Sequence, residues 1–316
     1  MKILITGAAG FLGNRLIETL LARPEGLGEV TSVVAADTVA GALDHPRVDH
    51  RTGTITDNDF VQSLVDDDPD VVYHLAAVLS GQSEADFDLG MRVNVDGTRS
   101  LLEACRRLKQ RPRVIFTSSV AVYGGLLPAV VPEDAPVWPQ SSYGMAKAVA
   151  DLLVSDYSRK GFIDGIACRL PTVAIRPGKP NSAMSSFVSG IIREPLAGID
   201  SVCPVPLDTR LWICSPDVLT RNLVHAARLE TSALGNRRAL NLPGLSVTPA
   251  EMLSSLERLG GAAARAHVRC APDAEIMRIV LTWPGAFDVS RALGLGFGID
   301  HDVDSIVRQF MAEPRP

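Results

Sequence analysis

Residues 3–13 read Ile-Leu-Ile-Thr-Gly-Ala-Ala-Gly-Phe-Leu-Gly. The opening run is apolar and β-branched, which is typical of a strand buried on both faces. Three glycines follow at intervals of three residues, and apolar residues at helical spacing come next, at Leu16, Ile17 and Leu20. A strand, a glycine loop and a helix in this order bring backbone N–H groups close to a phosphate. The stretch therefore predicts a dinucleotide site; the alternative is a glycine-rich turn that binds nothing.

The same strand and helix rhythm continues to about residue 175. We expect an α/β fold in which residues 1–175, with an added segment near 205–235, form a doubly wound, mostly parallel sheet of the Rossmann type. Beyond residue 176 proline, glycine and serine are dense and the rhythm breaks. Residues 176–316 are therefore expected to form mostly a smaller, discontinuous substrate-binding lobe. The other expected strands are 30–36, 71–77, 114–117 and 165–170, and the helices of the lobe are expected near 185–193, 217–228, 249–259 and 302–310.

The second expected strand ends at Asp37. A carboxylate at this strand end can accept hydrogen bonds from both ribose hydroxyls of an adenosine, and it repels a 2′-phosphate. No arginine follows at Thr38 or Val39 to pair with such a phosphate. The pattern favours NAD over NADP, although an aspartate at a strand end is also a common N-cap of a helix.

Tyr143 and Lys147 are four residues apart at the head of an expected helix, so both lie on one helical face. A phenol has a pKa of about 10 in water, and a neighbouring cation lowers it. The pair is therefore a candidate general base with its tuning charge, although Tyr-x-x-x-Lys also occurs by chance on many helices. Ser119 follows the strand 114–117, at the end where an open parallel sheet binds its ligand. We expect Ser119 to donate a hydrogen bond to a substrate oxygen.

The bulk composition excludes several classes of protein. Hydrophobic residues make up 46% of the 316 residues and charged residues 21%, which is typical of a soluble globular chain. The net charge is −5 and there is no Lys/Arg run, so we expect neither nucleic acid nor a membrane as partner. Five scattered cysteines without ligand spacing indicate reduced thiols in a cytoplasmic protein and no metal site. His74 lies inside an apolar strand and is interpreted as a core histidine.

Six stretches together resemble the extended short-chain dehydrogenase/reductases, the family that includes nucleotide-sugar epimerases and dehydratases. They are residues 6–13, 74–77, 94–98, 117–119, 143–147 and 210–213. The resemblance implies that Tyr143 is the catalytic acid/base, that Lys147 holds the nicotinamide ribose and lowers the tyrosine pKa, and that Ser119 binds the reacting oxygen. It also implies NAD as cofactor and a homodimer that forms through the helix after Asn94 and the helix that carries Tyr143. The residues it places at the cofactor are Gly7, Gly10, Phe11, Leu12, Gly13, Asp37, Thr54, Ile55, Leu75, Ala76, Ala77, Asn94, Tyr143, Lys147, Pro171 and Val173.

Three departures from the family pattern reduce the range of reactions and ligands that we expect for this chain. Val120 and Ala121 stand where the family's 4,6-dehydratases place Asp-Glu, so dehydration lacks its proton carriers. Thr54 replaces an aspartate that often contacts the adenine. Residues 210–215 read Arg-Leu-Trp-Ile-Cys-Ser in place of the usual Arg-Asp-aromatic-Ile-His-Val, which argues against a conventional nucleoside-diphosphate site.

Further stretches resemble the family members that oxidise the C2 hydroxyl of a small sugar acid with NAD. They are residues 78–90, 169–173, 176–181, 185–187, 191–196 and 241–248. Arg176 is then the expected partner of the acid's carboxylate, because a guanidinium binds a carboxylate in a bidentate way. Ser80 and Gln82 are expected to bind its other hydroxyls, and ordinary surface roles for all three residues stay open. Two other functions also stay open: a NAD-dependent nucleotide-sugar epimerase and a non-catalytic NAD(H)-binding sensor.

Overall fold

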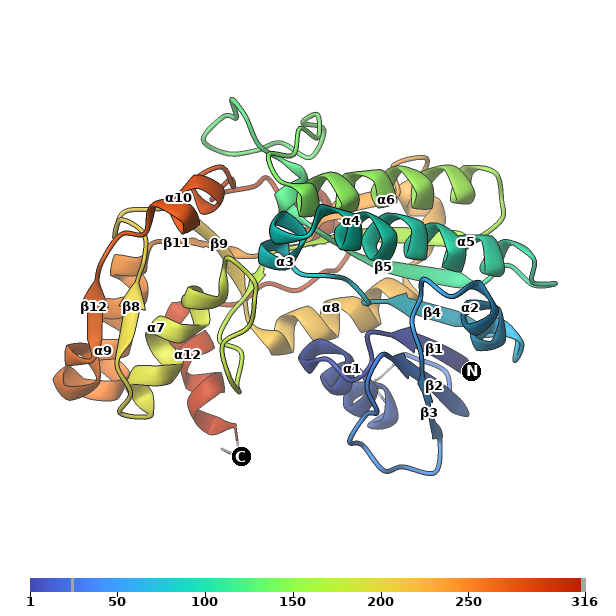
Figure 1. Cartoon of the computed structure of the whole chain (residues 1–316), viewed down its shortest axis with the longest axis horizontal. Helices are drawn as coiled ribbons and strands as arrows, with labels where there is room; N and C mark the ends of the chain where they lie inside the picture. The colour runs from blue at the N-terminus through green and yellow to red at the C-terminus, as the bar shows by residue number, and fades with distance from the viewer. Residues whose placement is uncertain (24–25, 314–316) are drawn as a thin grey trace. The chain divides into compact units, whose positions relative to one another are not determined.

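A seven-stranded sheet organises the computed structural model, which describes residues 1–23 and 26–313. From edge to edge its strands are β10 (Ala239–Asn241), β6 (Asp164–Leu170), β5 (Arg113–Ser119), β4 (Val71–His74), β1 (Lys2–Thr6), β2 (Ser32–Asp37) and β3 (Val48–Thr52). The pairings that join β5, β4, β1, β2 and β3 are parallel. The chain proceeds outward from β1 in both directions, which confirms the expected doubly wound α/β fold of the Rossmann type (Figure 1).

Burial on both faces explains why the inner strands form. Residues 3–6 of β1 and all four residues of β4 are buried, so an unbroken apolar run is favoured. The edge strand β3 is different, because its sequence Val-Asp-His-Arg-Thr has no apolar run and none of its residues is buried. Pairing with β2, rather than any local pattern, makes this segment a strand, and the sequence does not predict it.

Helices pack on the sheet through their apolar faces. α1 buries Leu16, Ile17 and Leu20, as the spacing predicts. α2, α5 and α6 share one core cluster with the strands, and α5 and α6 run side by side in Figure 1. A π-helix, η1 (Met91–Gly97), leads directly into α5 and contains Asn94. The four helices are α1 (Phe11–Leu21), α2 (Asn58–Val65), α5 (Thr98–Arg106) and α6 (Ser142–Arg159).

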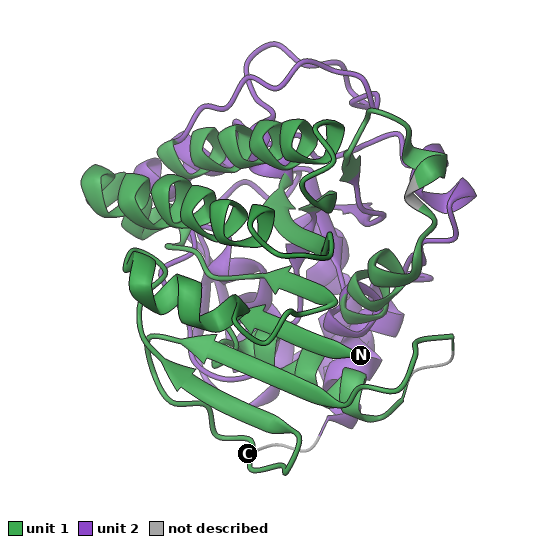
Figure 2. Cartoon of the chain, turned by 90° about the vertical axis from the view of Figure 1, so that its right-hand side faces the viewer, with its two compact units in different colours: residues 1–119, 142–169, 220–240 green, residues 120–141, 170–219, 241–316 purple. Residues whose placement is uncertain are grey.

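The chain divides into two units, which Figure 2 colours separately. Unit 1 comprises residues 1–119, 142–169 and 220–240, and unit 2 comprises residues 120–141, 170–219 and 241–316. This division differs from the expected one, because 120–141 and 170–175 belong to unit 2 and the segment added to unit 1 begins only at residue 220. Residues 120–141 join unit 2 through long-range contacts such as the bridge between Val131 and Phe287, which no local pattern reveals.

Unit 2 contains two small sheets and the helices expected in the C-terminal half. One sheet has the order β11 (Leu245–Val247), β9 (Leu211–Cys214), β7 (Thr172–Val173), and the other pairs β12 (Val268–Cys270) with β8 (Ser201–Cys203). The expected helices are present as α7 (Ser186–Leu196), α8 (Pro216–Arg228), α9 (Pro249–Ala266) and α12 (Val303–Ala312), and α8 passes from unit 2 into unit 1. Ile191, Leu253 and Val307 join α7, α9 and α12 in one core cluster.

Candidate active site

The loop between β1 and α1 requires its glycines. Gly7 has a φ of +72°, and a Cβ added to it would lie 2.7 Å from the backbone nitrogen of Ala76. A Cβ on Gly13 would lie 2.4 Å from the carbonyl oxygen of Gly7. α1 begins after Gly10 without a side-chain cap, which leaves the N–H groups of its first turn to an anion. The loop therefore fits the diphosphate of a dinucleotide.

Asp37, at the end of β2, lies beside this glycine loop. Its Oδ2 accepts a hydrogen bond from the Ala9 backbone N–H at 3.0 Å, and its Oδ1 accepts one from the Thr38 N–H at 2.7 Å. No helix follows β2 between residues 38 and 47, so the N-cap alternative does not apply. The carboxylate thus stands next to the phosphate loop, where the ribose contact is predicted.

Two other expected cofactor segments lie on loops that follow β3 and β4. The Leu75 and Ala76 N–H groups donate to the carbonyl and hydroxyl oxygens of Thr6, which fixes residues 75–77 against the glycine loop. Ile55 is buried in the core cluster, so its side chain is not available to a ligand. The Thr54 hydroxyl lies 2.9 Å from that of Thr56. Of the remaining expected contacts, Pro171 and Val173 belong to unit 2.

Asn94 supports the segment that follows β4. Its Oδ1 accepts a hydrogen bond from the Val78 N–H at 2.7 Å, and its Nδ2 donates to the Val78 carbonyl oxygen at 3.0 Å. The side chain is buried within the π-helix, a rare element that is frequent at functional sites. Nδ2 also lies 3.4 Å from the Ser83 hydroxyl, so Asn94 joins the loop after β4 to α3 (Ser80–Ala85).

Tyr143 and Ser119 come together at the N-terminal end of α6. The Ser119 side chain hydrogen-bonds the Tyr143 phenol. Burial is the larger influence and raises the pKa of Tyr143 to about 12, while the bond to Ser119 lowers it. A phenol with this pKa is protonated at neutral pH, so Tyr143 needs positive charge nearby to act as a base.

Lys147 is the cation on the same face of α6. Its Nζ donates to the Thr117 carbonyl oxygen at 2.7 Å and lies 4.6 Å from the ring centroid of Phe116. The same nitrogen lies 5.6 Å from the ring centroid of Tyr143. Burial lowers the pKa of Lys147 to about 8, and Asp151 opposes this effect. At this distance Lys147 can act on Tyr143 through its charge, and Thr117 is an anchor that the sequence did not reveal.

Glu84 is a second residue whose contact with the site the sequence does not reveal. It lies on α3 (Ser80–Ala85), and its Oε1 accepts a hydrogen bond from the Ser142 N–H at 2.6 Å. This bond holds α3 against the first turn of α6, next to Tyr143, and a carboxylate at a helix N-terminus is favoured by the helix dipole. The two residues are 58 positions apart in the sequence, so helical or strand periodicity gives no signal for their contact.

The two expected substrate residues on α3 differ in exposure. Ser80 is buried and engaged within the protein, whereas Gln82 is exposed. Since Glu84 ties α3 to α6, both belong to the same unit as Tyr143. The Gln82 side chain is thus accessible from outside the protein, and the substrate contacts of both residues stay predictions.

His74 is a core histidine, as expected. Its Nδ1 lies 2.6 Å from the Thr6 hydroxyl, and its Nε2 lies 3.0 Å from the Thr98 hydroxyl. Burial, with a smaller contribution from Lys147, lowers the pKa of His74 to about 3. The imidazole is therefore neutral near pH 7 and joins β1 to α5 rather than taking part in proton transfer.

Arg176 belongs to unit 2, in the irregular segment between β7 and α7. Its Nη2 donates to the Asn181 side-chain oxygen at 3.1 Å, and its carbonyl oxygen accepts a hydrogen bond from Arg193 at 2.7 Å. Burial and the nearby Arg193 both lower the pKa of Arg176, although a guanidinium stays charged. Arg193 is itself paired with Glu194, so Arg176 alone is kept as the candidate for binding a carboxylate.

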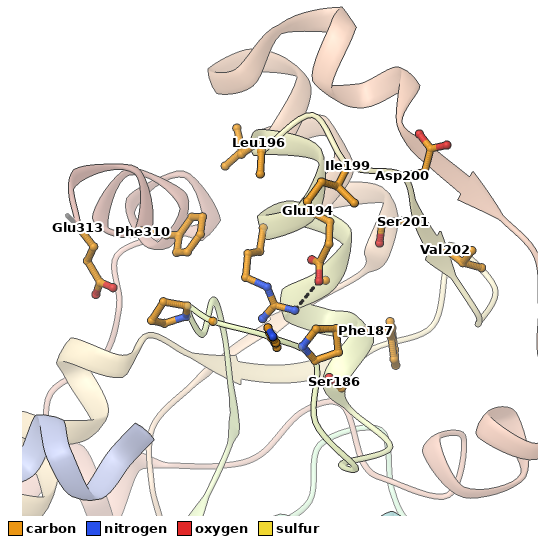
Figure 3. Close-up of a pocket in the computed structure, with 17 residues that line it drawn as sticks. Ser186, Phe187, Glu194, Leu196, Ile199, Asp200, Ser201, Val202, Phe310 and Glu313 are labelled. Atoms are coloured by element: carbon orange, nitrogen blue, oxygen red, sulfur yellow. Dashed lines mark hydrogen bonds and ion pairs between the residues drawn. The ribbon is translucent and has the colours of Figure 1, made fainter. Parts of the chain in front are cut away.

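A cavity of about 720 Å³ opens within unit 2, against α7, β8 and the end of α12 (Figure 3). Its lining is mainly apolar and includes Phe187, Leu196 and Phe310, with the Arg193–Glu194 ion pair in its wall. Among the described residues, none that the sequence places at cofactor or substrate lines it. We therefore locate the candidate active site at Tyr143 and Lys147 and not in this cavity.

Other kinds of site find little support in the described part of the chain. All five cysteines are unpaired, and four of them are buried. No cluster of three or more metal-ligating side chains occurs within residues 1–23 and 26–313. Over the same residues, no helix has both the length and the apolar character needed to cross a membrane.

Comparison with known proteins follows the chain over most of its length. The model of the NAD dependent epimerase/dehydratase family matches residues 3–230. A D-erythronate dehydrogenase from Cupriavidus necator is 51% identical over 322 residues, which cover 99% of this chain and 98% of that protein. A D-erythronate dehydrogenase from Haemophilus influenzae is 43% identical and covers 98% of this chain and 99% of its own length.

Solved structures show the same fold. The nucleoside-diphosphate-sugar epimerase from Agrobacterium tumefaciens has a TM-score of 0.94 at 41% identity, covering 99% of this chain and 94% of that one. The L-threonine 3-dehydrogenase from Trypanosoma brucei has a TM-score of 0.87 at 26% identity, covering 97% and 94%.

Proposed function

Because the chain belongs to the NAD dependent epimerase/dehydratase family, as its motifs predict, we propose that it oxidises the C2 hydroxyl of D-erythronate to 2-dehydro-D-erythronate with NAD⁺. Full-length similarity to two proteins named D-erythronate dehydrogenase supports this substrate. The observation that carries the chemistry is the hydrogen bond between Ser119 and Tyr143, with the buried cation Lys147 one helical turn further on.

We assign a residue of the chain to each step on the protein side. Ser119 and Tyr143 hold the C2 oxygen, and Tyr143 as phenolate takes the hydroxyl proton, a contribution of about 10²–10⁴-fold. Lys147 stabilises that phenolate by its charge. NAD⁺, when bound, accepts the hydride from C2. The glycine loop and Asp37 would hold its diphosphate and adenosine ribose.

The carboxylate of the acid needs a separate partner. Arg176 supplies a guanidinium, with Asn181 holding one of its nitrogens, and a bidentate ion pair of this kind is among the stronger hydrogen-bonded contacts. Gln82, and less directly Ser80, are proposed to bind the hydroxyls at C3 and C4. These contacts would explain a preference for a short sugar acid over a neutral sugar.

The experiment is a panel of four- to six-carbon sugar acids with NAD⁺ or NADP⁺, scored by NADH or NADPH formed. We expect the highest kcat/KM for D-erythronate with NAD⁺. If every sugar acid fails while NAD(H) binds tightly, the proposal is wrong and the non-catalytic sensor becomes the better interpretation.

A nucleotide-sugar epimerase is the second candidate. It is favoured by one observation, the close structural match to the Agrobacterium tumefaciens protein described as a nucleoside-diphosphate-sugar epimerase. An epimerase regenerates its cofactor, so it would interconvert UDP-sugars without net NADH. The unusual Leu211 to Ser215 segment argues against a conventional nucleotide site.

We further propose that the protein is a cytoplasmic homodimer that uses α6. Leu152 on α6 is 66% exposed, which supports an interface there. The apolar residues of α5, such as Leu101 and Leu102, are instead buried in the core and are not available to a partner. Light scattering should give twice the mass of the chain, and Leu152→Glu should shift it toward the monomer; a monomeric parent protein would contradict the proposal.

A further inference from the structure

The face of α6 that carries Tyr143 and Lys147 continues to a buried acid. Asp151 lies four residues beyond Lys147, so the three side chains follow one helical stripe. Asp151 is 3% exposed, and its Oδ2 accepts a hydrogen bond from Arg169 Nε at 2.8 Å. Arg169 comes from β6 and is itself buried. A buried ion pair thus stands directly behind the lysine of the candidate active site.

The groups that surround Lys147 and Asp151 come from four elements. α6 contributes Tyr143 and Asp151, and β5 contributes the Thr117 carbonyl oxygen. From β4 comes His74, whose pKa of about 3 leaves it uncharged, and from β6 come Arg169 and Cys168. Burial raises the pKa of the Cys168 thiol to about 12, so it is neutral as well. Burial raises the pKa of the Asp151 carboxyl, and the ion pair with Arg169 opposes this rise, so Asp151 and Arg169 compensate each other's charge.

We infer that Asp151 is a positioning residue that keeps Lys147 protonated, and that Arg169 limits how much of the Asp151 charge Lys147 experiences. An ammonium buried in apolar surroundings loses its proton unless a carboxylate compensates. Burial lowers the pKa of Lys147, and Asp151 partly offsets this effect, which agrees with the arrangement. The catalytic role of the Lys147 charge rests on the proposed function. The protonation of Lys147 does not depend on that function.

The arrangement predicts opposite effects for its two partners. Asp151→Asn removes the carboxylate that raises the Lys147 pKa and leaves the Arg169 charge uncompensated, so the pKa of Lys147 should fall. Arg169→Gln leaves the whole carboxylate charge to Lys147, so the pKa of Lys147 should rise. If the ion pair had only a structural role, its loss would lower stability in both variants. It would not shift the Lys147 pKa in opposite directions.

Direct titration of Lys147 tests this without cofactor or substrate. The chain has five lysines, so ¹³C labelling at the lysine ε-carbon gives a sparse NMR spectrum, and Lys147→Met identifies the Lys147 signal. We expect a midpoint near pH 8 in the parent protein, a fall of about one pH unit in Asp151→Asn and a rise of about one in Arg169→Gln. Equal midpoints, or shifts of the same sign, would overturn the inference.

Two conservative variants keep the test valid if a buried substitution impairs folding. Arg169→Lys preserves the charge and should leave the Lys147 midpoint close to that of the parent, while Arg169→Gln moves it. Asp151→Glu should likewise restore the midpoint that Asp151→Asn lowers. The pH dependence of kcat then shows whether catalysis follows the lysine. If the lysine midpoints move as expected but no sugar acid is oxidised, the proposed function fails and the inference stands.

Discussion

Lys147 and Arg176 are the two cations of the proposed reaction, and the protein holds them in different ways. Lys147 lies on an 18-residue helix packed on the main sheet, 3% exposed, with its ammonium on a strand carbonyl. Arg176 lies in an irregular segment of unit 2 and is held by Asn181. Regular elements therefore position the residues of the proposed proton transfer, whereas a loop positions the proposed substrate contact. Loops vary more readily than sheets, so the substrate can change while the chemistry is kept.

The largest loss of activity is expected from a substitution on α6. Tyr143→Phe removes the base but keeps the ring, so kcat should fall about 10³-fold while NAD⁺ affinity changes little. Steady-state kinetics and calorimetric titration with NAD⁺ measure the two quantities. A variant that retains near-normal kcat would show that Tyr143 is not the base.

A smaller effect, on KM rather than kcat, is expected at Arg176. Arg176→Gln removes a charged hydrogen-bonding partner worth roughly 1.5–3 kcal/mol, so KM for the sugar acid should rise about 10- to 100-fold. Lys179→Gln is the matched control, because Lys179 is an exposed cation three residues away. Equal changes in both variants would mean that Arg176 acts only through the general charge of the loop.

A substitution of Asp37 tests whether the end of β2 binds the adenosine ribose. Asp37→Ala should raise KM for NAD⁺ about tenfold and relax the preference over NADP⁺, since the carboxylate no longer repels a 2′-phosphate. The hydrogen bond to the Ala9 N–H is lost as well, so thermal unfolding should be measured in parallel. An unchanged ratio of kcat/KM for the two cofactors would assign the ribose contact to another residue.

The smallest effect is expected at Glu84, which joins α3 to α6. Glu84→Ala removes the acceptor of the Ser142 N–H and should cost about 1 kcal/mol of stability and a few-fold in kcat. Glu84→Gln keeps an acceptor oxygen and should lie closer to the parent. Loss of stability with unchanged kcat would make Glu84 a structural cap without influence on Tyr143.

The features that the sequence predicts are those encoded within a few residues. Glycines at intervals of three, an apolar run ahead of them and the four-residue spacing of Tyr143 and Lys147 each follow from the geometry of one element. Their assembly on one doubly wound sheet follows from parallel pairing of buried strands.

What the sequence could not reveal depends on contacts between distant residues. The bond of Glu84 to Ser142, the Thr117 carbonyl under Lys147 and the membership of 120–141 in unit 2 all join segments far apart in the chain. The edge strand β3 forms by pairing, without an apolar pattern of its own. Asp151 is an intermediate case, because its spacing from Lys147 is visible in the sequence but its burial against Arg169 is not.

The central claim is that hydride leaves C2 of a small sugar acid while Tyr143 takes the hydroxyl proton. The most direct measurement uses D-erythronate deuterated at C2 with NAD⁺ and follows the label by mass spectrometry. The account predicts one deuterium in NADH for each 2-oxo acid formed, and no such product from Tyr143→Phe at the same enzyme concentration. Unlabelled NADH, or label retained on the product, would contradict it.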